Sequence, residues 1–343
     1  MKKLITLMSL AIVGLSFGQG EEPTFTVKGS VDAYWRANLS SHNDVDDGEA
    51  GYQTPSVFAN NPGFSVGMAN VTFSYEGDDV GFVADFAYGP RASAGVDAYS
   101  AEPDGTQGGG VINEAYMYWN ASETMTLYMG RFNNWMGFER LSPVGNFNYS
   151  MSHAFSFGVR NVNGLAANFD LGNDFKIGVG VMNPVDVTYN NNTGDYSVAF
   201  GLSKGDTGAS VISSQDATFI DFKHMFNIND KFNMGVNVHK ADYEDSAAGS
   251  DRPGDGFTSI SMYPQIQYSD DWSYGLRLEY IAFDDYATDN VITPTLTANY
   301  KVGGLTIKPE FRLDMSEARI FENNDGDSTA NLTSFVLAAV YSF

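Results

Sequence analysis

The C-terminal segment FVLAAVYSF (335–343) keeps a period-2 alternation up to its last residue. Every second residue from Phe335 to Phe343 is apolar and shares one face of an extended strand, and the residues between them share the other face. An untethered chain end gains nothing from such a face, and most domains end in a few polar residues. The segment therefore predicts a final strand that is tied into a larger sheet.

The same alternation recurs along most of the chain, and no helical period competes with it. Over 25–36, for example, apolar residues at odd positions alternate with Lys28, Asp32 and Arg36 at even positions. The segments are about ten residues long, which exceeds the common globular strand and matches the ~9–11 residues of a tilted transmembrane strand. Sixteen strands are predicted, with 14 or 18 as alternative counts, at 25–38, 65–76, 80–90, 111–120, 124–132, 161–171, 175–183, 195–204, 208–214, 216–226, 231–241, 257–268, 272–283, 291–302, 304–314 and 330–343.

Short and long connections alternate between these strands. Tight turns such as EGDDV (76–80) and NINDK (227–231) are followed by longer polar loops such as 39–64, 90–110 and 132–155. Short turns on one side and long loops on the other are typical of outer-membrane barrels. We therefore predict an all-β fold, a transmembrane antiparallel β-barrel with short periplasmic turns and longer extracellular loops. The final strand is expected to close the barrel by pairing with the first.

A soluble β-sandwich or propeller would also alternate. Aromatic residues at the ends of the apolar faces, such as Trp35 and Trp272, favour a bilayer, because Trp and Tyr collect at membrane interfaces. Pro264, Pro294 and Pro309 conflict with a barrel, because each removes a backbone donor from a predicted strand.

The N-terminal residues MKKLITLMSLAIVGLSFGQG have the pattern of a secretory signal peptide. Lys2 and Lys3 precede an apolar stretch, and Ser16 and Gly18 are the small residues expected before a cleavage site. We predict removal of residues 1–18, with cleavage after Gly20 as the alternative, and a single barrel domain over 19–343.

Composition narrows the classes of partner. Removing Lys2 and Lys3 from the 19 basic residues leaves 17 against 42 acidic ones, a formal charge of −25. Nucleic acid is excluded as a partner, because its recognition requires a basic footprint. The chain has no Cys, so disulfides and a lipid anchor on Cys are excluded.

The middle of the chain resembles a known family. The segment MGRFNNWMGFERLSPVGNFNYSMSHAF (129–155) joins a strand ending at Arg131 to Gly-Phe-Glu (137–139) and an Asn/Ser-rich stretch. With RLEYIAFDD (277–285) and PEFRLDMSEARIF (309–321), it is similar to the OmpL-like family of outer-membrane β-barrel porins of Gram-negative bacteria. The resemblance implies a passive channel of unassigned substrate and no cofactor.

The predicted inward faces carry charges of both signs. The charged residues expected to line the pore are Lys28, Asp32, Arg36, Asp85, Glu114, Lys223, Arg277, Glu279, Lys308, Glu310, Arg312 and Asp314. These signs nearly balance, so most of the negative charge belongs to loops and turns, such as Asp44 to Glu49. We therefore expect a mixed-charge wall and an acidic mouth that favours cations, or charges that only pair across strands. Loop 132–155, with Arg131, Glu139 and Arg140, is a candidate constriction or a lid.

Two other classes of function remain open at this point. A barrel hydrolase acting on lipid or peptide would need a Ser-His pair, and His239 is the best candidate base. A structural or adhesive barrel would have a plugged lumen and no conductance. The acidic segments 43–49 and 323–328 lack the ligand spacing of a calcium loop, so no metal site is predicted.

The expected partners follow from the location. We expect outer-membrane lipid, small solutes or ions, and the barrel-assembly machinery, whose recognition signal the terminal Tyr341 and Phe343 resemble. A homotrimer is one oligomeric state that the sequence leaves open.

Overall fold

The computed structural model describes residues 23–43, 62–96, 112–185, 191, 193–244, 254–285 and 290–343. The predicted signal peptide and the acidic residues Asp44 to Glu49 lie outside the described residues.

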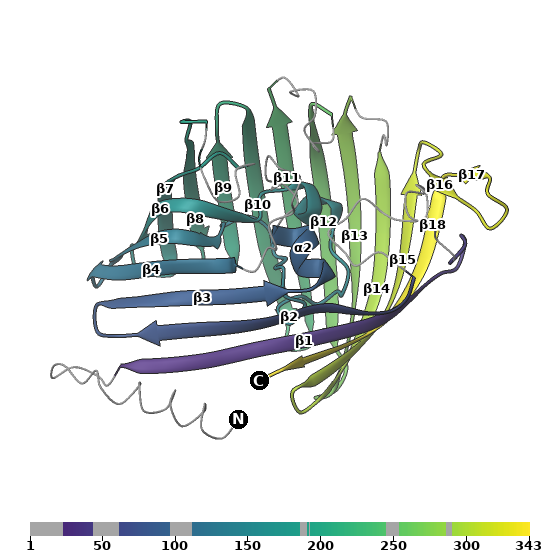
Figure 1. The fold of residues 1–343 in the computed structure, drawn as a ribbon, viewed down its shortest axis with the longest axis horizontal. Helices are drawn as coiled ribbons and strands as arrows, with labels where there is room; N and C mark the ends of the chain where they lie inside the picture. The colour runs from purple at the N-terminus through teal and green to yellow at the C-terminus, as the bar shows by residue number, and fades with distance from the viewer. Residues whose placement is uncertain are drawn as a thin grey trace.

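Sixteen antiparallel strands of the described chain close into one barrel (Figure 1). Each strand pairs with its neighbours in sequence, and the last barrel strand closes on the first. The predicted fold and strand count are therefore confirmed, and the pair at 208–214 and 216–226 is present as β9 and β10. The barrel strands are β1 (Thr24–Asn38), β2 (Gly63–Glu76), β3 (Val80–Tyr88), β4 (Ile112–Ser122), β5 (Met125–Asn133), β6 (Asn161–Asp170), β7 (Phe175–Met182), β8 (Ser197–Lys204), β9 (Thr207–Ser213), β10 (Ala217–Asn229), β11 (Phe232–Tyr243), β12 (Gly256–Gln267), β13 (Trp272–Asp284), β14 (Val291–Val302), β15 (Leu305–Ser316) and β18 (Asn331–Ser342).

The remaining elements are short. Helix α2 (Pro90–Val96) follows β3, and helix α3 (His153–Phe157) lies between β5 and β6. A small hairpin of β16 (Phe321–Glu322) and β17 (Ser328–Thr329) lies between β15 and β18. No helix in the described part of the chain is long and apolar enough to cross a bilayer.

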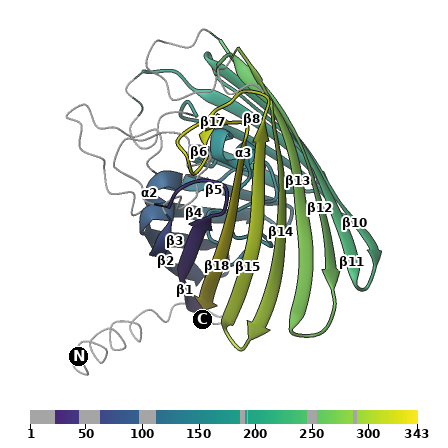
Figure 2. The same ribbon diagram turned by 90° about the vertical axis from the view of Figure 1, so that its right-hand side faces the viewer.

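The C-terminal segment forms the seam of the barrel, where β18 pairs with β1. The two strands pair from Ser30 opposite Ser342 to Asn38 opposite Ser334. Beyond the last strand residue, Phe343 N–H donates to the Gly29 carbonyl at 3.1 Å, and Gly29 N–H donates to the Phe343 carbonyl at 3.2 Å. Figure 2 shows β1, β18, β15 and β14 side by side, with short turns at one end of the barrel. The chain end is therefore hydrogen-bonded to its last residue.

The two faces of each strand differ as the alternation predicts. On β15, Phe311 points outward with 51% of its surface exposed, whereas its neighbours Glu310 and Arg312 are only 1% and 2% exposed. Aromatic pairs line the outside near the turns, such as Trp272 with Tyr300, whose ring centroids are 4.7 Å apart. An apolar exterior with aromatic residues at its edge matches a bilayer and its interfaces.

The three prolines lie at interruptions of the ladder. The pairing of β12 with β13 is interrupted around Pro264, and the pairing of β14 with β15 is interrupted around Pro294 and again around Pro309. On its other side, each proline still lies opposite a residue of the neighbouring strand. Each interruption coincides with the donor that proline lacks, so the barrel loses a few rungs and keeps its register.

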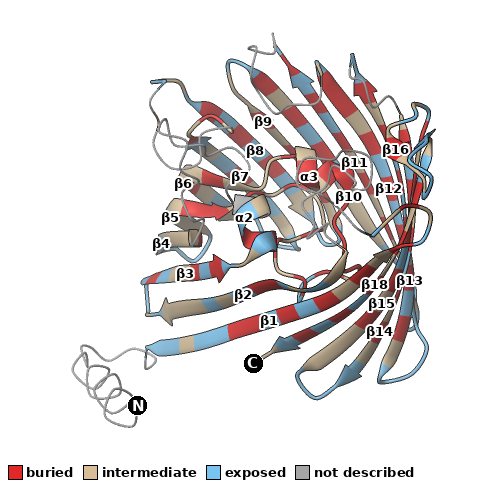
Figure 3. Ribbon diagram, turned by 45° about the vertical axis from the view of Figure 1, so that its right-hand side comes forward, coloured by how far each residue is buried: buried red, intermediate tan, exposed pale blue. Residues whose placement is uncertain are grey.

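Part of the inner wall is apolar, although the alternation predicts polar inward faces. Near the loop ends of β10–β13, the buried residues include Phe219, Ala241, Phe257 and Phe283. Phe157 of α3 meets the Phe283 ring edge-on at 5.3 Å between centroids. The apolar wall therefore faces a segment of the protein rather than water, as Figure 3 shows for α3 and its buried surroundings.

Candidate functional site

The connection between β5 and β6, residues 134–160, lies inside the barrel and is called the inward loop below. Met136, Leu141, Tyr149 and Met151 of this loop are each at most 5% exposed. The prediction left its position open between a constriction and a lid, and the contacts with the far wall decide for the lumen. The loop also begins later and ends later than the predicted range of 132–155.

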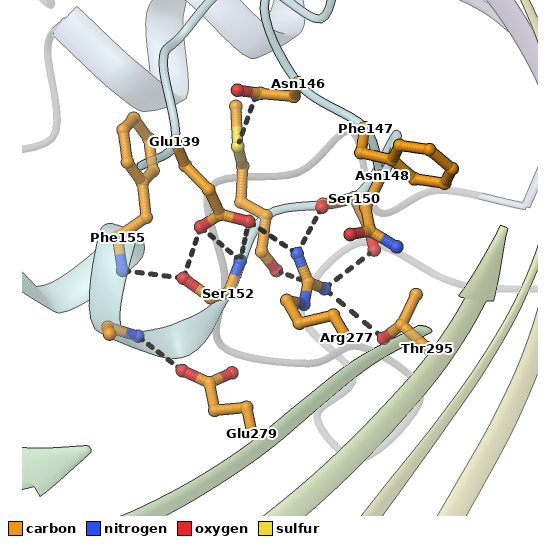
Figure 4. Close-up of polar contacts among 12 residues, drawn as sticks. Glu139, Asn146, Phe147, Asn148, Ser150, Ser152, Phe155, Arg277, Glu279 and Thr295 are labelled. Atoms are coloured by element: carbon orange, nitrogen blue, oxygen red, sulfur yellow. Dashed lines mark hydrogen bonds and ion pairs between the residues drawn. The ribbon is translucent and has the colours of Figure 1, made fainter. Parts of the chain in front are cut away.

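Arg277 of β13 is the centre of the main anchor (Figure 4). Its Nη1 lies 2.6 Å from Glu139 Oε1 and donates to the Ser150 carbonyl at 2.6 Å. Its Nη2 donates to the Met151 carbonyl at 3.1 Å. Glu139 also accepts hydrogen bonds from the backbone N–H and the hydroxyl of Ser152. The guanidinium of Arg277 and the carboxylate of Glu139 therefore form an ion pair and also make further hydrogen bonds, as buried charges require.

Glu279, also on β13, binds the start of α3. Its carboxylate accepts from the N–H groups of His153 and Ala154, both at 2.8 Å, and the His153 Nδ1 lies 3.1 Å away. Unpaired N–H groups at a helix N-terminus attract an anion, and Ser152 caps the same turn by accepting from Phe155 N–H at 3.0 Å. This anchor explains why a carboxylate from the wall is needed at this point of the lumen.

Three charged residues of β15 hold the middle of the loop. Glu310 accepts from the N–H groups of Tyr149 and Ser150 at 2.7 and 2.9 Å. Arg312 donates to the Met151 carbonyl at 2.6 Å, and Lys308 donates to three loop carbonyls, including that of Pro143 at 3.0 Å. Inward charges of both signs therefore satisfy the backbone of the loop, and Arg312 also pairs with the buried Asp314 of the same strand at 2.9 Å.

Strand β10 holds the beginning of the loop. Lys223 donates to the carbonyls of Trp135 and Gly137 at 2.9 and 2.7 Å. Asp221 accepts from Gly137 N–H at 3.1 Å and lies 3.1 Å from the Nδ1 of His239. The loop is therefore fixed near both of its ends and in its middle.

A second loop braces the first. Arg91 of α2 is fully buried, stacks over the Tyr149 ring at 4.5 Å and donates to the Tyr149 carbonyl at 2.8 Å. Tyr149 donates its hydroxyl proton to Asp32 of β1 at 2.6 Å. A bulge in β2 places Gly67 beside this pair, where a Cβ atom would overlap the Asp32 carboxylate. Burial raises the pKa of the Tyr149 hydroxyl above its usual value of 10.0.

The remaining predicted residues belong to strands of the barrel wall, and some of them line a space beside the inward loop. Asp85 accepts from Asn70, Thr72 and Asn113, and Glu114 accepts from Asn133 N–H at 3.0 Å. Lys28, Asp85, Glu114 and Arg140 line one cavity. Arg36 is buried on β1 and donates to Asn38 at 2.9 Å.

Arg131 does not belong to the loop. It lies in β5 opposite Asn163 of β6, and its Nε donates to the Asn113 carbonyl at 3.2 Å. Strand pairing continues to Asn133, so Arg131 lies in the wall just before the inward loop, and its role at a constriction stays a prediction. Glu139 and Arg140 do lie in the inward loop.

Three of the spaces beside the inward loop are large enough for a small solute. The largest, about 540 Å³, lies on the turn side and is lined by Asn233, Gln265, Lys301 and others. The second, about 400 Å³, lies against β1–β5, and the third, about 270 Å³, lies against β6–β10. Each lining combines polar and apolar surface, so water and small hydrophilic solutes can occupy these spaces.

The described histidines have different side-chain partners, and the Nδ1 of His224 lies 2.7 Å from the Thr207 hydroxyl at the β9–β10 wall. The rings of His153 and His239 have carboxylates as their side-chain partners, namely Glu279 and Asp314 for His153 and Asp221 for His239. Neither ring bonds a serine hydroxyl in the described part of the chain. No cluster of three or more potential metal-binding side chains occurs among the described residues.

Sequence reasoning missed Arg91, Tyr149 and the amides of the loop. Asn148 donates to Thr297 at 2.7 Å, and Asn146 accepts from Arg140 N–H at 2.8 Å. The available signal was the concentration of Asn and Ser in NFNYSMS (146–152), because such side chains satisfy the backbone of a buried irregular segment.

Comparison with known proteins gives a family and a set of similar folds. A family model described as "Putative beta-barrel porin-2, OmpL-like" matches residues 24–343. The fold is similar to the outer membrane channel DcaP of Acinetobacter baumannii, with 16% identity, 96% of this chain and 99% of that chain covered, and a TM-score of 0.59. The anion-selective porin from Comamonas acidovorans is similar at 9% identity, with 94% and 100% covered and a TM-score of 0.62.

Pseudomonas putida OprB is also similar, at 11% identity, with 94% of each chain covered and a TM-score of 0.56. At these identities the solved structures establish the barrel fold alone. No curated protein matches the sequence significantly.

Proposed function

The chain belongs to the OmpL-like β-barrel porin family, and from this premise we propose that it is an outer-membrane channel for passive diffusion of small hydrophilic solutes or ions. One observation carries the proposal: the inward loop occupies the middle of the lumen but leaves spaces of about 540, 400 and 270 Å³ beside it, each lined in part by polar and charged side chains. A loop fixed in this way narrows a pore and leaves its walls wet.

We further propose that the channel favours cations. The short turns carry eight acidic residues against the single base Lys231: Asp78, Asp79, Glu123, Asp174, Asp206, Asp230, Asp270 and Asp271. The described parts of the long loops outside the lumen are acidic too, with residues such as Asp285, Glu322 and Asp325. Two acidic rims raise the local cation concentration at both mouths, and this field weakens as salt increases.

Planar-bilayer recording of the refolded protein tests both parts. We expect discrete channels whose reversal potential in a KCl gradient has the sign of a K⁺ preference, more strongly at low salt. Replacing Asp270 and Asp271 by Asn should reduce that preference, whereas Thr124→Ala, a neutral change in another turn whose hydroxyl contacts Ser122, should leave it in place. A folded protein without conductance would instead support the plugged structural barrel, and an anion preference would refute the role of the rims.

Export and assembly complete the proposal. Residues 1–18 would be removed on secretion, which N-terminal sequencing of the mature protein tests. Tyr341 and Phe343, which are 48% and 67% exposed, would be read by the barrel-assembly machinery. We also propose a homotrimer in the lipid bilayer. The mass of the detergent-extracted protein tests this oligomeric state.

A further inference from the structure

The space between the inward loop and β6–β10 differs in charge from the space on the other side of the loop. This cavity of about 270 Å³, called the cationic cavity below, is lined by Arg140, Lys176 and Lys223, and none of its described lining residues is acidic. The cavity against β1–β5 contains the carboxylates of Asp85 and Glu114. Arg140 lines both cavities, so the difference in charge comes from the wall residues of β6–β10 and of β1–β5.

Arg140 is held in place by its neighbours in the loop. The Asn146 side chain accepts from Arg140 N–H at 2.8 Å and donates to the Arg140 carbonyl at 2.6 Å. The Arg140 Nη1 donates to the Glu139 carbonyl at 2.9 Å. Glu114 attracts this guanidinium electrostatically from the β4 wall, but no carboxylate of the described residues forms a direct ion pair with it.

The two lysines come from the opposite wall. The Lys223 ammonium donates to the carbonyls of Trp135 and Gly137. Its positive charge is close enough to that of Arg140 for the two to repel each other. The carboxylate nearest to Lys223 in the strand, Asp221, is already occupied by His239, Asn237 and Gly137. Lys176 is 60% exposed, and its only ion pair with a described residue is with the half-exposed Asp170 at 3.8 Å.

The cavity also offers an apolar surface. Trp135 lies against the glycines of the wall, where a Cβ on Gly178 would approach the indole to 2.8 Å and one on Gly201 to 3.0 Å. The side chain of Leu202 shares the exposed outer face of β8 with Phe200, so the indole of Trp135 is the apolar surface that we assign to the cavity. An inorganic ion would gain nothing from this ring, whereas the carbon skeleton of an organic solute would cover it.

We propose that the cationic cavity is a binding subsite for small organic anions that carry carboxylate groups. A guanidinium fork matches a carboxylate in two parallel hydrogen bonds, and the lysines supply further charge-assisted donors. The inference rests on the proposed channel function and adds a solute class to it. It is compatible with a cation preference for salt, because rim charges act on bulk ions over about a Debye length and the subsite acts by contact.

Block of the KCl current by succinate tests the subsite in the whole channel. Succinamide and 1,4-diaminobutane have the same carbon skeleton and serve as the neutral and cationic probes. We expect succinate alone to interrupt the current in a concentration-dependent way. Arg140→Gln should weaken the block about tenfold, as expected for one charge-assisted hydrogen bond. Lys176→Gln should weaken it about threefold, because Lys176 is exposed and partly screened.

Lys204→Gln is the matched control, since Lys204 is a lysine of the adjacent strand β8 that lines none of the three spaces. Equal block by succinamide, or equal weakening by Lys204→Gln, would overturn the subsite. If Arg140→Gln fails to fold, Lys176→Gln and the charge reversal Lys176→Glu decide the question. A protein that conducts but ignores succinate refutes only the subsite, whereas a protein that does not conduct refutes the channel itself.

Discussion

Arg277 of β13 and Glu139 of the inward loop form a buried ion pair of 2.6 Å, and they are 138 positions apart in the chain. The two residues belong to opposite sides of the lumen and meet only because the loop crosses it. This pair is the point at which we expect the loop to be most sensitive to substitution.

Arg277→Met should release the loop from β13. Glu139 would then be a buried carboxylate without its cation, which costs about 3–5 kcal/mol when one partner of such a pair is removed. We expect a lower melting temperature in detergent and larger, noisier single-channel currents. Adding Glu139→Gln should recover part of the loss, and Arg319→Met, an exposed arginine of the same size, should change neither readout. Unchanged conductance in Arg277→Met would show that the loop does not restrict the pore.

Gly67→Ala should disturb the Tyr149–Asp32 contact. The added methyl group would occupy the position of the Asp32 carboxylate, and overpacking of this kind costs about 1–3 kcal/mol. Gly145→Ala is the control, because its nearest neighbours would be Arg140 carbons at an ordinary 3.8 Å. Chemical denaturation of the two variants measures the difference, and equal stability would contradict the close approach at Gly67.

Tyr149 predicts a specific alkaline sensitivity. Burial raises its pKa in the folded protein above the value of 10.0 expected in the unfolded chain. The stabilisation from its neutral hydroxyl is therefore complete below pH 10 and decreases as pH rises toward the folded pKa. Tyr149→Phe removes this titration, so its stability should fall less steeply above pH 10 than that of the unsubstituted protein. Parallel stability curves in that range would argue against a buried, neutral Tyr149.

The terminal aromatic residues should act in assembly more than in stability. Phe343→Ala keeps the backbone hydrogen bonds with Gly29, so its folded barrel should melt close to the normal temperature. Insertion into the outer membrane should nevertheless slow for Phe343→Ala and for Tyr341→Ala, as followed by heat-modifiable migration in gels. Ser342→Ala, on the other face of the same strand, should insert normally. Normal insertion of both aromatic variants would remove the case for a recognition signal.

The sequence predicts the barrel well because lipid imposes a simple rule on every strand. Residues such as Phe311 must face the bilayer and residues such as Arg312 must not, so the period-2 pattern gives strand limits within a few residues of the observed ones. Turn and loop lengths then give the direction of each connection.

The inward loop could not be predicted in the same way. Its contacts join residues far apart in the chain, such as Asn148 and Thr297, and no periodic pattern records a pairing between a loop and a distant wall. The alternation predicts which charges of the wall point inward, but apart from side-chain pairs such as Arg312 with Asp314, many of their partners are backbone groups of the loop. Every residue type carries the same backbone carbonyl, and all but proline carry the same N–H group. The identity of the loop residues therefore does not indicate which of them a wall charge will bind.

The inward loop starts and ends at β5 and β6, and its main anchors lie on β13 and β15. In the ring of sixteen strands, β5 and β13 are eight strands apart, so the loop follows a diameter of the cross-section. A segment that is anchored at both ends of a diameter resists flattening of the barrel cross-section. Lateral pressure from the bilayer would therefore be carried in part by Arg277, Glu279 and Glu310, and the shape of the whole wall would depend on a segment that never touches lipid.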